Sequence, residues 1–237
     1  MALQEQQRMQ AGATTTAAVD EGLRRHMIRV YNYMTGGLAL TGLVAYVVAH
    51  TPAFFNAIFG TPLMWVVMLA PLGFVFALSF GIERFKYSTA QLLFWAFAGI
   101  MGMSIASIFV IYTGESIARV FFISAATFAG MSLYGYTTKR DLTRFGSFLM
   151  MGLIGIIIAS IVNLFVQSSM LHFAVSVIGV LIFVGLTAHD TQRIKWMYDQ
   201  ADGVTVAGKK ALMGALSLYL DFINLFLLLL RLFGERR

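Results

Sequence analysis

The chain has 237 residues, of which 59% are hydrophobic and only 12% are charged, and its mean hydropathy is +0.78. These proportions exclude an ordinary soluble domain and indicate a polytopic membrane protein. The chain has no cysteine, which excludes a disulfide framework and a thiolate metal site. The formal net charge of +6 is spread in a way that indicates membrane topology, not a nucleic-acid partner.

The N-terminal segment is polar, is rich in small residues and lacks the apolar stretch of a signal peptide. This composition predicts a disordered cytoplasmic tail over residues 1–22. The remainder, residues 23–237, is predicted to form a single transmembrane domain, because no internal repeat and no second domain is recognisable in it.

Seven stretches are long and apolar enough to cross a membrane, since a spanning helix needs about 20 mostly apolar residues. The expected fold is therefore all-α, with short connectors between the helices. The predicted spans are Val30–Ala49, Leu63–Ile82, Ala90–Ile111, Ser116–Gly135, Phe148–Val166, Leu171–Asp190 and Leu212–Phe233. Pro71 lies inside the second span, where it should kink the helix.

The lysine and arginine residues predict the orientation of these spans. Thirteen of the 17 lie on one side of the membrane, in the N-terminal tail and in the connectors that follow spans two, four and six. Because cytoplasmic loops are enriched in basic residues, we expect the N-terminus in the cytoplasm and the C-terminus outside. The basic residues of the final GERR segment would then lie outside, against the usual distribution. A re-entrant last helix would return this segment to the cytoplasmic side, and the sequence leaves that possibility open.

Asp221 lies in the middle of the last span, where an ionisable group costs at least about 2.5 kcal/mol in a bilayer. Ser217 precedes it by four residues and Asn224 follows it by three, so the three side chains share one helical face. This polar stripe is predicted to face the interior of the bundle. A single buried hydrogen bond to a neighbouring helix is the structural alternative, but intramembrane acids are usually functional.

Asp190, at the end of span six, is the expected partner of Asp221. Spans six and seven are consecutive and antiparallel, so the two acids can face each other. In a dry site they could not both ionise cheaply and would share one proton, which makes the pair a pH sensor. The carboxylates are also two of the six to eight oxygen ligands that Ca²⁺ requires. Alternatively, Asp190 is an interfacial residue that pairs with Arg193.

Three segments of the chain resemble the transmembrane Bax inhibitor motif family, also called the Bax inhibitor-1 family, in its bacterial branch. They are YGYTTKRDL (Tyr134–Leu142), HDTQRIK (His189–Lys195) and LSLYLDFINLF (Leu216–Phe226). The resemblance implies six helices around a central C-terminal helix and a pH-sensitive calcium leak channel in a bacterial inner membrane. It also implies that Asp190 and Asp221 are the pH-sensing pair and the ligands of the transported Ca²⁺.

The resemblance further implies an arginine latch that holds the sixth-helix aspartate in the closed state, and the matching position is Arg84. A guanidinium can hold a carboxylate bidentately, which gives the latch an independent physical reason. Two departures from the family pattern stand out. Leu63–Ile82 lacks the acid that some bacterial relatives carry there. His189 replaces a common aromatic residue, and it could tune the pair or, as we expect, point elsewhere.

Each class of function other than a channel requires particular residues. A retinal protein needs a lysine within span seven, and none lies between Ala211 and Phe233. An enzyme is disfavoured, because the spans offer no thiol, no paired histidine metal set and no serine–histidine dyad. A proton-coupled ion transporter uses the same buried acids, and a non-conducting regulator of a membrane protease or of a stress response also remains open. No cofactor is expected; Ca²⁺ would be the transported ion and protons the regulator.

Overall fold

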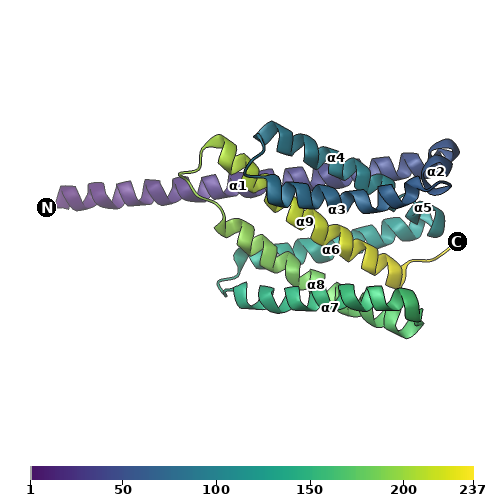
Figure 1. The fold of residues 1–237 in the computed structure, drawn as a ribbon. Coiled ribbons are helices and arrows are strands. Elements are labelled where there is room, and N and C mark those ends of the chain that lie inside the picture. Colours follow the sequence, from purple (N-terminus) through teal and green to yellow (C-terminus); the bar gives the residue numbers. More distant parts are fainter. Residues whose placement is uncertain (1) are drawn as a thin grey trace.

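The structure, a computed structural model, describes the backbone of residues 2–237 and the side chains of residues 21–237. It is all-α in its architecture. The helices are α1 (Ala2–His50), α2 (Pro52–Phe59), α3 (Leu63–Gly81), α4 (Tyr87–Ile105), α5 (Ile108–Ile111), α6 (Gly114–Thr137), α7 (Thr143–Val166), α8 (Ser169–Trp196) and α9 (Val204–Phe233). Figure 1 shows them as an elongated bundle from which the N-terminal part of α1 projects.

Within the part of the chain that the structure describes, seven helical stretches are long and apolar enough to cross a membrane, which confirms the predicted spans. Several helices continue past the predicted ends of their spans, because polar residues outside the hydrocarbon can remain helical. The first span begins at Glu21, for example, and α8 continues to Trp196. The third span comprises α4 and α5, and the short α2 fills the first connector with Pro52 at its first turn.

The predicted tail, residues 1–22, falls mostly outside the described side chains, which begin at residue 21. Its backbone from Ala2 is part of α1. The disorder of the tail and its cytoplasmic location both stay predictions.

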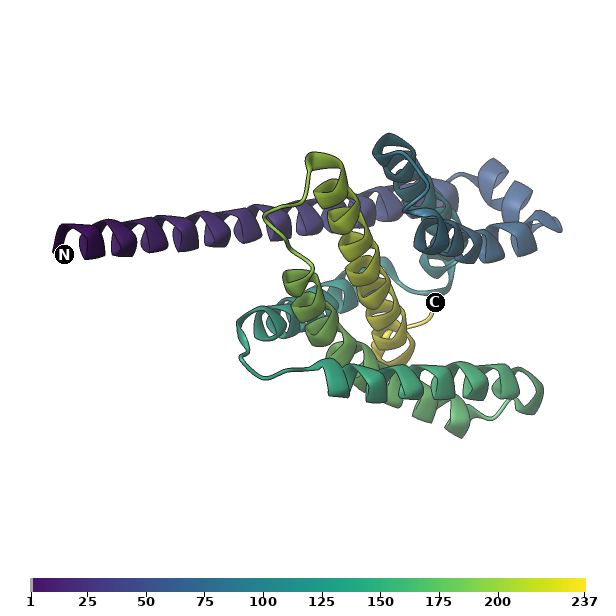
Figure 2. The same ribbon diagram turned by 60° about the vertical axis from the view of Figure 1, so that its left-hand side comes forward.

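Helix α9 is the centre of the bundle, as the family resemblance implied. It packs against α1, α4, α6 and α8, and 72% of its most apolar stretch is buried. Helix α3 packs on α4, and α7 packs on α8. Figure 2 shows α9 passing between the α3–α4 pair and α7. The core around α9 is rich in large apolar and aromatic side chains, among them Phe94, Phe97, Leu218, Tyr219 and Leu225.

The C-terminus lies at the end of the bundle opposite the α8–α9 connector. Helix α9 is continuous to Phe233, and the residues after it join the α5–α6 connector. The Thr113 N–H donates to Glu235 O at 3.0 Å, the Arg237 N–H donates to Ile111 O at 3.0 Å, and the side chains of Arg119 and Glu235 form an ion pair at 2.8 Å. The last helix therefore crosses the bundle completely, and the re-entrant alternative is wrong.

Candidate functional site

A cavity of about 770 Å³ lies between α3, α7, α8 and α9. Its lining follows α8 from Val175 to Arg193, about 27 Å at 1.5 Å per residue, which is close to the hydrocarbon thickness of a bilayer. Most of the lining is apolar. The polar side chains in it are Ser160, His189, Asp190, Arg193, Ser217, Asp221, Asn224 and Arg231. A polar strip thus lies within an otherwise apolar cavity that runs most of the way across the membrane.

Asp221 comes to this cavity from the central helix. The residue is only 5% exposed, and its Oδ2 atom has no hydrogen-bond partner among the described residues. Ser217 and Asn224 line the same cavity, so the polar stripe of α9 lies where the sequence placed it, and the Asn224 amide donates to Leu220 O at 2.8 Å. A buried polar atom without a partner costs about 1–3 kcal/mol, and more if it is charged. The structural alternative, one buried hydrogen bond to a neighbouring helix, is not seen at Oδ2.

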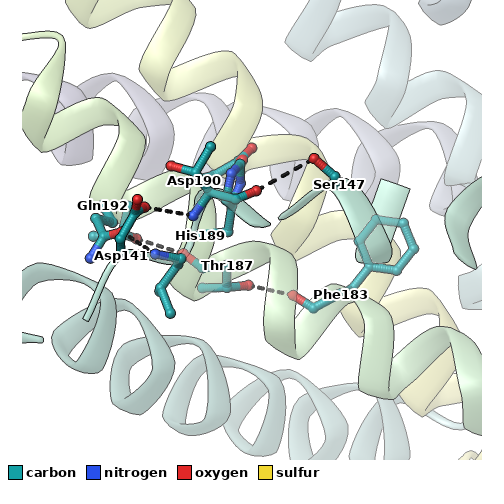
Figure 3. A network of polar contacts seen from close by, with 10 residues as sticks. Asp141, Ser147, Phe183, Thr187, His189, Asp190 and Gln192 are labelled. Carbon is teal, nitrogen blue, oxygen red and sulfur yellow. Dashed lines mark hydrogen bonds and ion pairs between the residues drawn. The ribbon is translucent and has the colours of Figure 1, made fainter. Parts of the chain in front are cut away.

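Asp190 lines the cavity from α8, next to His189. The Nδ1 atom of His189 lies 2.8 Å from the Oδ1 atom of Asp190, and both side chains are mostly buried. Figure 3 shows His189 and Asp190 next to each other within a network of polar contacts. The expectation that His189 points elsewhere is therefore wrong. The reason lies on α7: Gly146 has no side chain, and a Cβ atom there would overlap the imidazole ring.

Neither of the two arginines that the sequence offers as ion-pair partners of Asp190 holds it in this structure. Among the described residues, Asp190 has its ion pair with His189, and neither Arg193 nor Arg84 is paired with it. Arg84 lies exposed in the connector between α3 and α4. The structure therefore brings Asp190, Asp221 and their polar neighbours to one cavity but leaves Arg84 outside it, and the latch stays a prediction.

Sequence reasoning missed Gln192, which holds a connector near this site. The side chain is buried; its Oε1 accepts from the Leu142 N–H at 2.9 Å, and its Nε2 donates to Arg140 O at 2.8 Å. Gln192 thereby ties the α6–α7 connector to α8 (Figure 3). The only signal for it was its place in the HDTQRIK segment.

Asp141, in the same connector, stabilises the start of α7. Its Oδ1 accepts from the Thr143 N–H at 2.9 Å. Hydrogen bonds from Thr143 and the nearby charge of Arg144 hold the pKa of Asp141 below its usual value. The connector is therefore fixed to α7 by Asp141 and to α8 by Gln192.

Arg231 is a second residue whose position the sequence did not predict. It lines the cavity ten residues beyond Asp221 on α9. Arg193 lines the cavity from the opposite end of the bundle. An ion that moved along the cavity would pass a guanidinium on each side of the two carboxylates.

Comparisons with known proteins place the chain in a family. Residues 23–237 match the family model described as "Inhibitor of apoptosis-promoting Bax1". An uncharacterised protein of Rickettsia prowazekii is 52% identical over 227 residues, which cover 94% of this chain and 96% of that one.

A second relative carries a descriptive name. The inner membrane protein YbhL of Escherichia coli K12 is 46% identical over 219 residues, covering 91% of this chain and 94% of its own. An uncharacterised protein of Caulobacter vibrioides is 47% identical over 230 residues, with 93% and 92% covered. The seven spans and these matches together show that the chain is a multi-pass membrane protein of the Bax inhibitor family.

Proposed function

We propose that this protein is a pH-sensitive calcium leak channel of the bacterial inner membrane. In this proposal Asp190 and Asp221 form the gate and the ion site, and Arg84 is the latch. The observation that carries it is the Asp221 carboxyl group, buried without a partner for Oδ2 in a cavity that follows α8 across most of the membrane. A chain keeps such an atom in spite of its cost when function requires it.

The acid pair supplies the response to pH. Asp190 and Asp221 line one mostly apolar cavity from adjacent helices. Two carboxylates in such a site repel each other, so one proton is shared between them over a range of pH. Loss of that proton leaves two negative charges that attract a divalent cation. Gain of a proton removes the attraction and weakens any ion pair that holds Asp190.

The small number of oxygen ligands at the acid pair suits a transported ion better than a permanently bound one. Ca²⁺ takes six to eight oxygen ligands, and two carboxylates offer only part of that number. Among the described residues, no three His, Asp or Glu side chains come together as a metal site. Weak binding allows the ion to leave, as conduction requires. Because Arg193 and Arg231 line the cavity on either side of the acids, we expect a slow leak and not a high conductance.

The latch requires Asp190 to exchange partners. Its Oδ1 atom bonds to His189, and Arg84 lies exposed in the α3–α4 connector. A bidentate Arg84–Asp190 pair would hold the end of α3 against α8 and narrow the cavity between them. The proposal therefore predicts two arrangements of Asp190, one on His189 and one on Arg84, with protonation of Asp190 favouring release from Arg84.

The test is Ca²⁺ flux into proteoliposomes of the purified protein between about pH 5 and pH 8, which brackets a carboxyl pair with a shared proton. We expect a pH-dependent flux that Asp221→Asn abolishes or makes independent of pH. The matched control is Asp199→Asn, which removes an exposed carboxylate in the α8–α9 connector and should leave the flux unchanged. Wild-type protein that moves no Ca²⁺ at any pH, or an Asp221→Asn variant that behaves like wild type, would overturn the proposal.

The same assay separates the two alternatives. A proton-coupled transporter would need obligatory exchange, so its Ca²⁺ flux would stop when no counter-ion gradient can form, whereas a leak needs only the Ca²⁺ gradient. A non-conducting regulator of a membrane protease would show no flux for any variant, and its partner binding would survive Asp221→Asn.

A further inference from the structure

A second and larger cavity, of about 1290 Å³, lies between α1 and α6, with Phe222 of α9 also in its lining. The lining follows one face of α1 from Arg24 to Tyr46, at helical spacings of three and four residues. That stretch is about 33 Å long, similar to the thickness of the hydrocarbon core. The cavity is called the α1–α6 groove below. It contains neither Asp190 nor Asp221, so it is separate from the proposed ion site.

The groove is polar at one end and apolar along most of its length. Arg24, Tyr31, Ser132 and Tyr136 line the end near Glu21, where the first membrane span begins, and the hydroxyl groups of Tyr31 and Ser132 hydrogen-bond to each other there. Farther along, four small residues leave the groove open: Ala39, Gly42, Ala125 and Ala129. An adjoining cavity of about 320 Å³ continues the apolar volume toward Phe226. This lining fits an amphiphilic molecule with one polar end.

The polar end is also cationic. The Arg24 side chain is 68% exposed, and its Nη1 forms a long ion pair of 3.7 Å with Glu21 Oε2. Glu21 is held more closely by Arg25, at 3.0 Å. The Lys195 ammonium group donates to Tyr136 O at 2.9 Å and lies 5.1 Å from the centre of the Tyr136 ring. The exposed guanidinium of Arg24 is therefore able to bind an anion at the mouth of the groove, and the Lys195 ammonium group lies beside Tyr136 of the lining.

We propose that the α1–α6 groove binds one anionic phospholipid. Its phosphate group contacts Arg24 at the mouth, and an acyl chain lies along the small residues of α1 and α6. The mouth is on the side predicted to be cytoplasmic, where basic residues near the membrane surface attract anionic headgroups. A helix of a second copy would fill the apolar part of the groove but would leave the cationic mouth unmatched, so the charge favours a lipid.

The headgroup contact can be tested by native mass spectrometry of the protein released from detergent. The two probes are phosphatidylglycerol and phosphatidylcholine with identical acyl chains. We expect one phosphatidylglycerol per chain, retained in preference to phosphatidylcholine. Arg24→Gln should weaken the retention of phosphatidylglycerol about five-fold, the effect expected of one basic residue at a membrane surface. Arg29→Gln, which removes an exposed arginine of α1 that does not line the groove, is the matched control and should have no such effect.

The acyl-chain contact needs a variant that leaves Arg24 untouched. Ala129→Phe fills the groove from α6, and we expect it to lower lipid retention at least as much as Arg24→Gln. Ala126→Phe adds the same ring to an exposed position of α6 outside the lining and should have no effect.

Three results would overturn the proposal. The first is equal retention of the two lipids, and the second is unchanged retention in both Arg24→Gln and Ala129→Phe. The third is a dimer in the mass spectrum that Ala129→Phe dissociates, which would assign the groove to a second copy of the chain.

Discussion

Helices α7 and α9 both cross the membrane, but they occupy opposite environments. The most apolar stretch of α7 is only 6% buried, although α7 is the more hydrophobic of the two, whereas that of α9 is 72% buried. Lipid tails are as apolar as leucine, so hydrophobicity does not draw a helix into the centre of a membrane bundle. Close packing and polar groups decide instead, and α9 carries Ser217, Asp221 and Asn224.

The two helices differ in what their side chains must do. Side chains that face lipid contribute apolar surface and little else, so the exposed large residues of α7 can be exchanged for other apolar residues. Side chains that face the centre must fit their neighbours. Tyr219, for instance, is fully buried against the rings of Phe94 and Phe97, and its hydroxyl lies 2.6 Å from Thr41 Oγ1.

The largest expected effect follows from Tyr219. Tyr219→Ala should destabilise the fold by about 3 kcal/mol, because it leaves a cavity in the core and removes the hydrogen bond to Thr41. Phe165→Ala on α7, where the ring is 84% exposed, should change stability by less than about 0.5 kcal/mol. Thermal unfolding in detergent micelles measures both. Similar losses for the two variants would contradict the contrast between centre and periphery.

A smaller effect is expected where two helices approach closely. A Cβ atom on Gly135 of α6 would overlap the backbone of Ala188 on α8, whereas one on Gly130 of the same helix would meet nothing within 4 Å. Gly135→Ala should therefore destabilise the fold by about 1–3 kcal/mol, as overpacking does. Gly130→Ala should be neutral or slightly stabilising, since alanine favours helix. Equal unfolding midpoints would show that the α6–α8 contact can relax at no cost.

The buried acid of α9 should behave in the opposite sense. Asp221→Leu removes the carboxyl oxygen that has no partner, so we expect the protein to gain about 1 kcal/mol of stability. Asn224→Leu, a few residues along the same stripe, removes a side chain that does have a partner and should not stabilise. The measurement is the unfolding midpoint of each variant and of wild type at neutral pH. A loss of stability in Asp221→Leu would mean that the carboxyl group is satisfied in the membrane.

The smallest effect concerns the connector that leads into α7. The folded-state pKa of Asp141 is lowered, so its carboxylate stabilises the fold above its unfolded pKa of about 3.9, and this contribution is lost as pH falls through the folded value. We expect Asp141→Asn to lower Tm slightly at pH 7 and to match wild type in strong acid. A Tm difference that did not change with pH would rule out the charge as its cause.

The candidate site was only partly predictable. Ser217, Asp221 and Asn224 were placed on one face by helical periodicity, because the offsets of three and four residues are local properties of a helix. The orientation of His189 was predicted wrongly, because the space for its ring is created by Gly146, more than forty residues away on another helix. Gln192 was missed for a similar reason, since both of its partners lie in the α6–α7 connector.

The membrane environment, the seven spans and the acid at the centre of the last span are all predictable from the sequence. These follow from length, hydropathy and helical period, which are properties of short stretches of chain. The packing of the folded chain adds that Asp190 pairs with His189 while Arg84 lies apart, and that α1 and α6 enclose a groove with Arg24 at its mouth. Each of these depends on how side chains from distant helices fit together, and no local pattern encodes that fit.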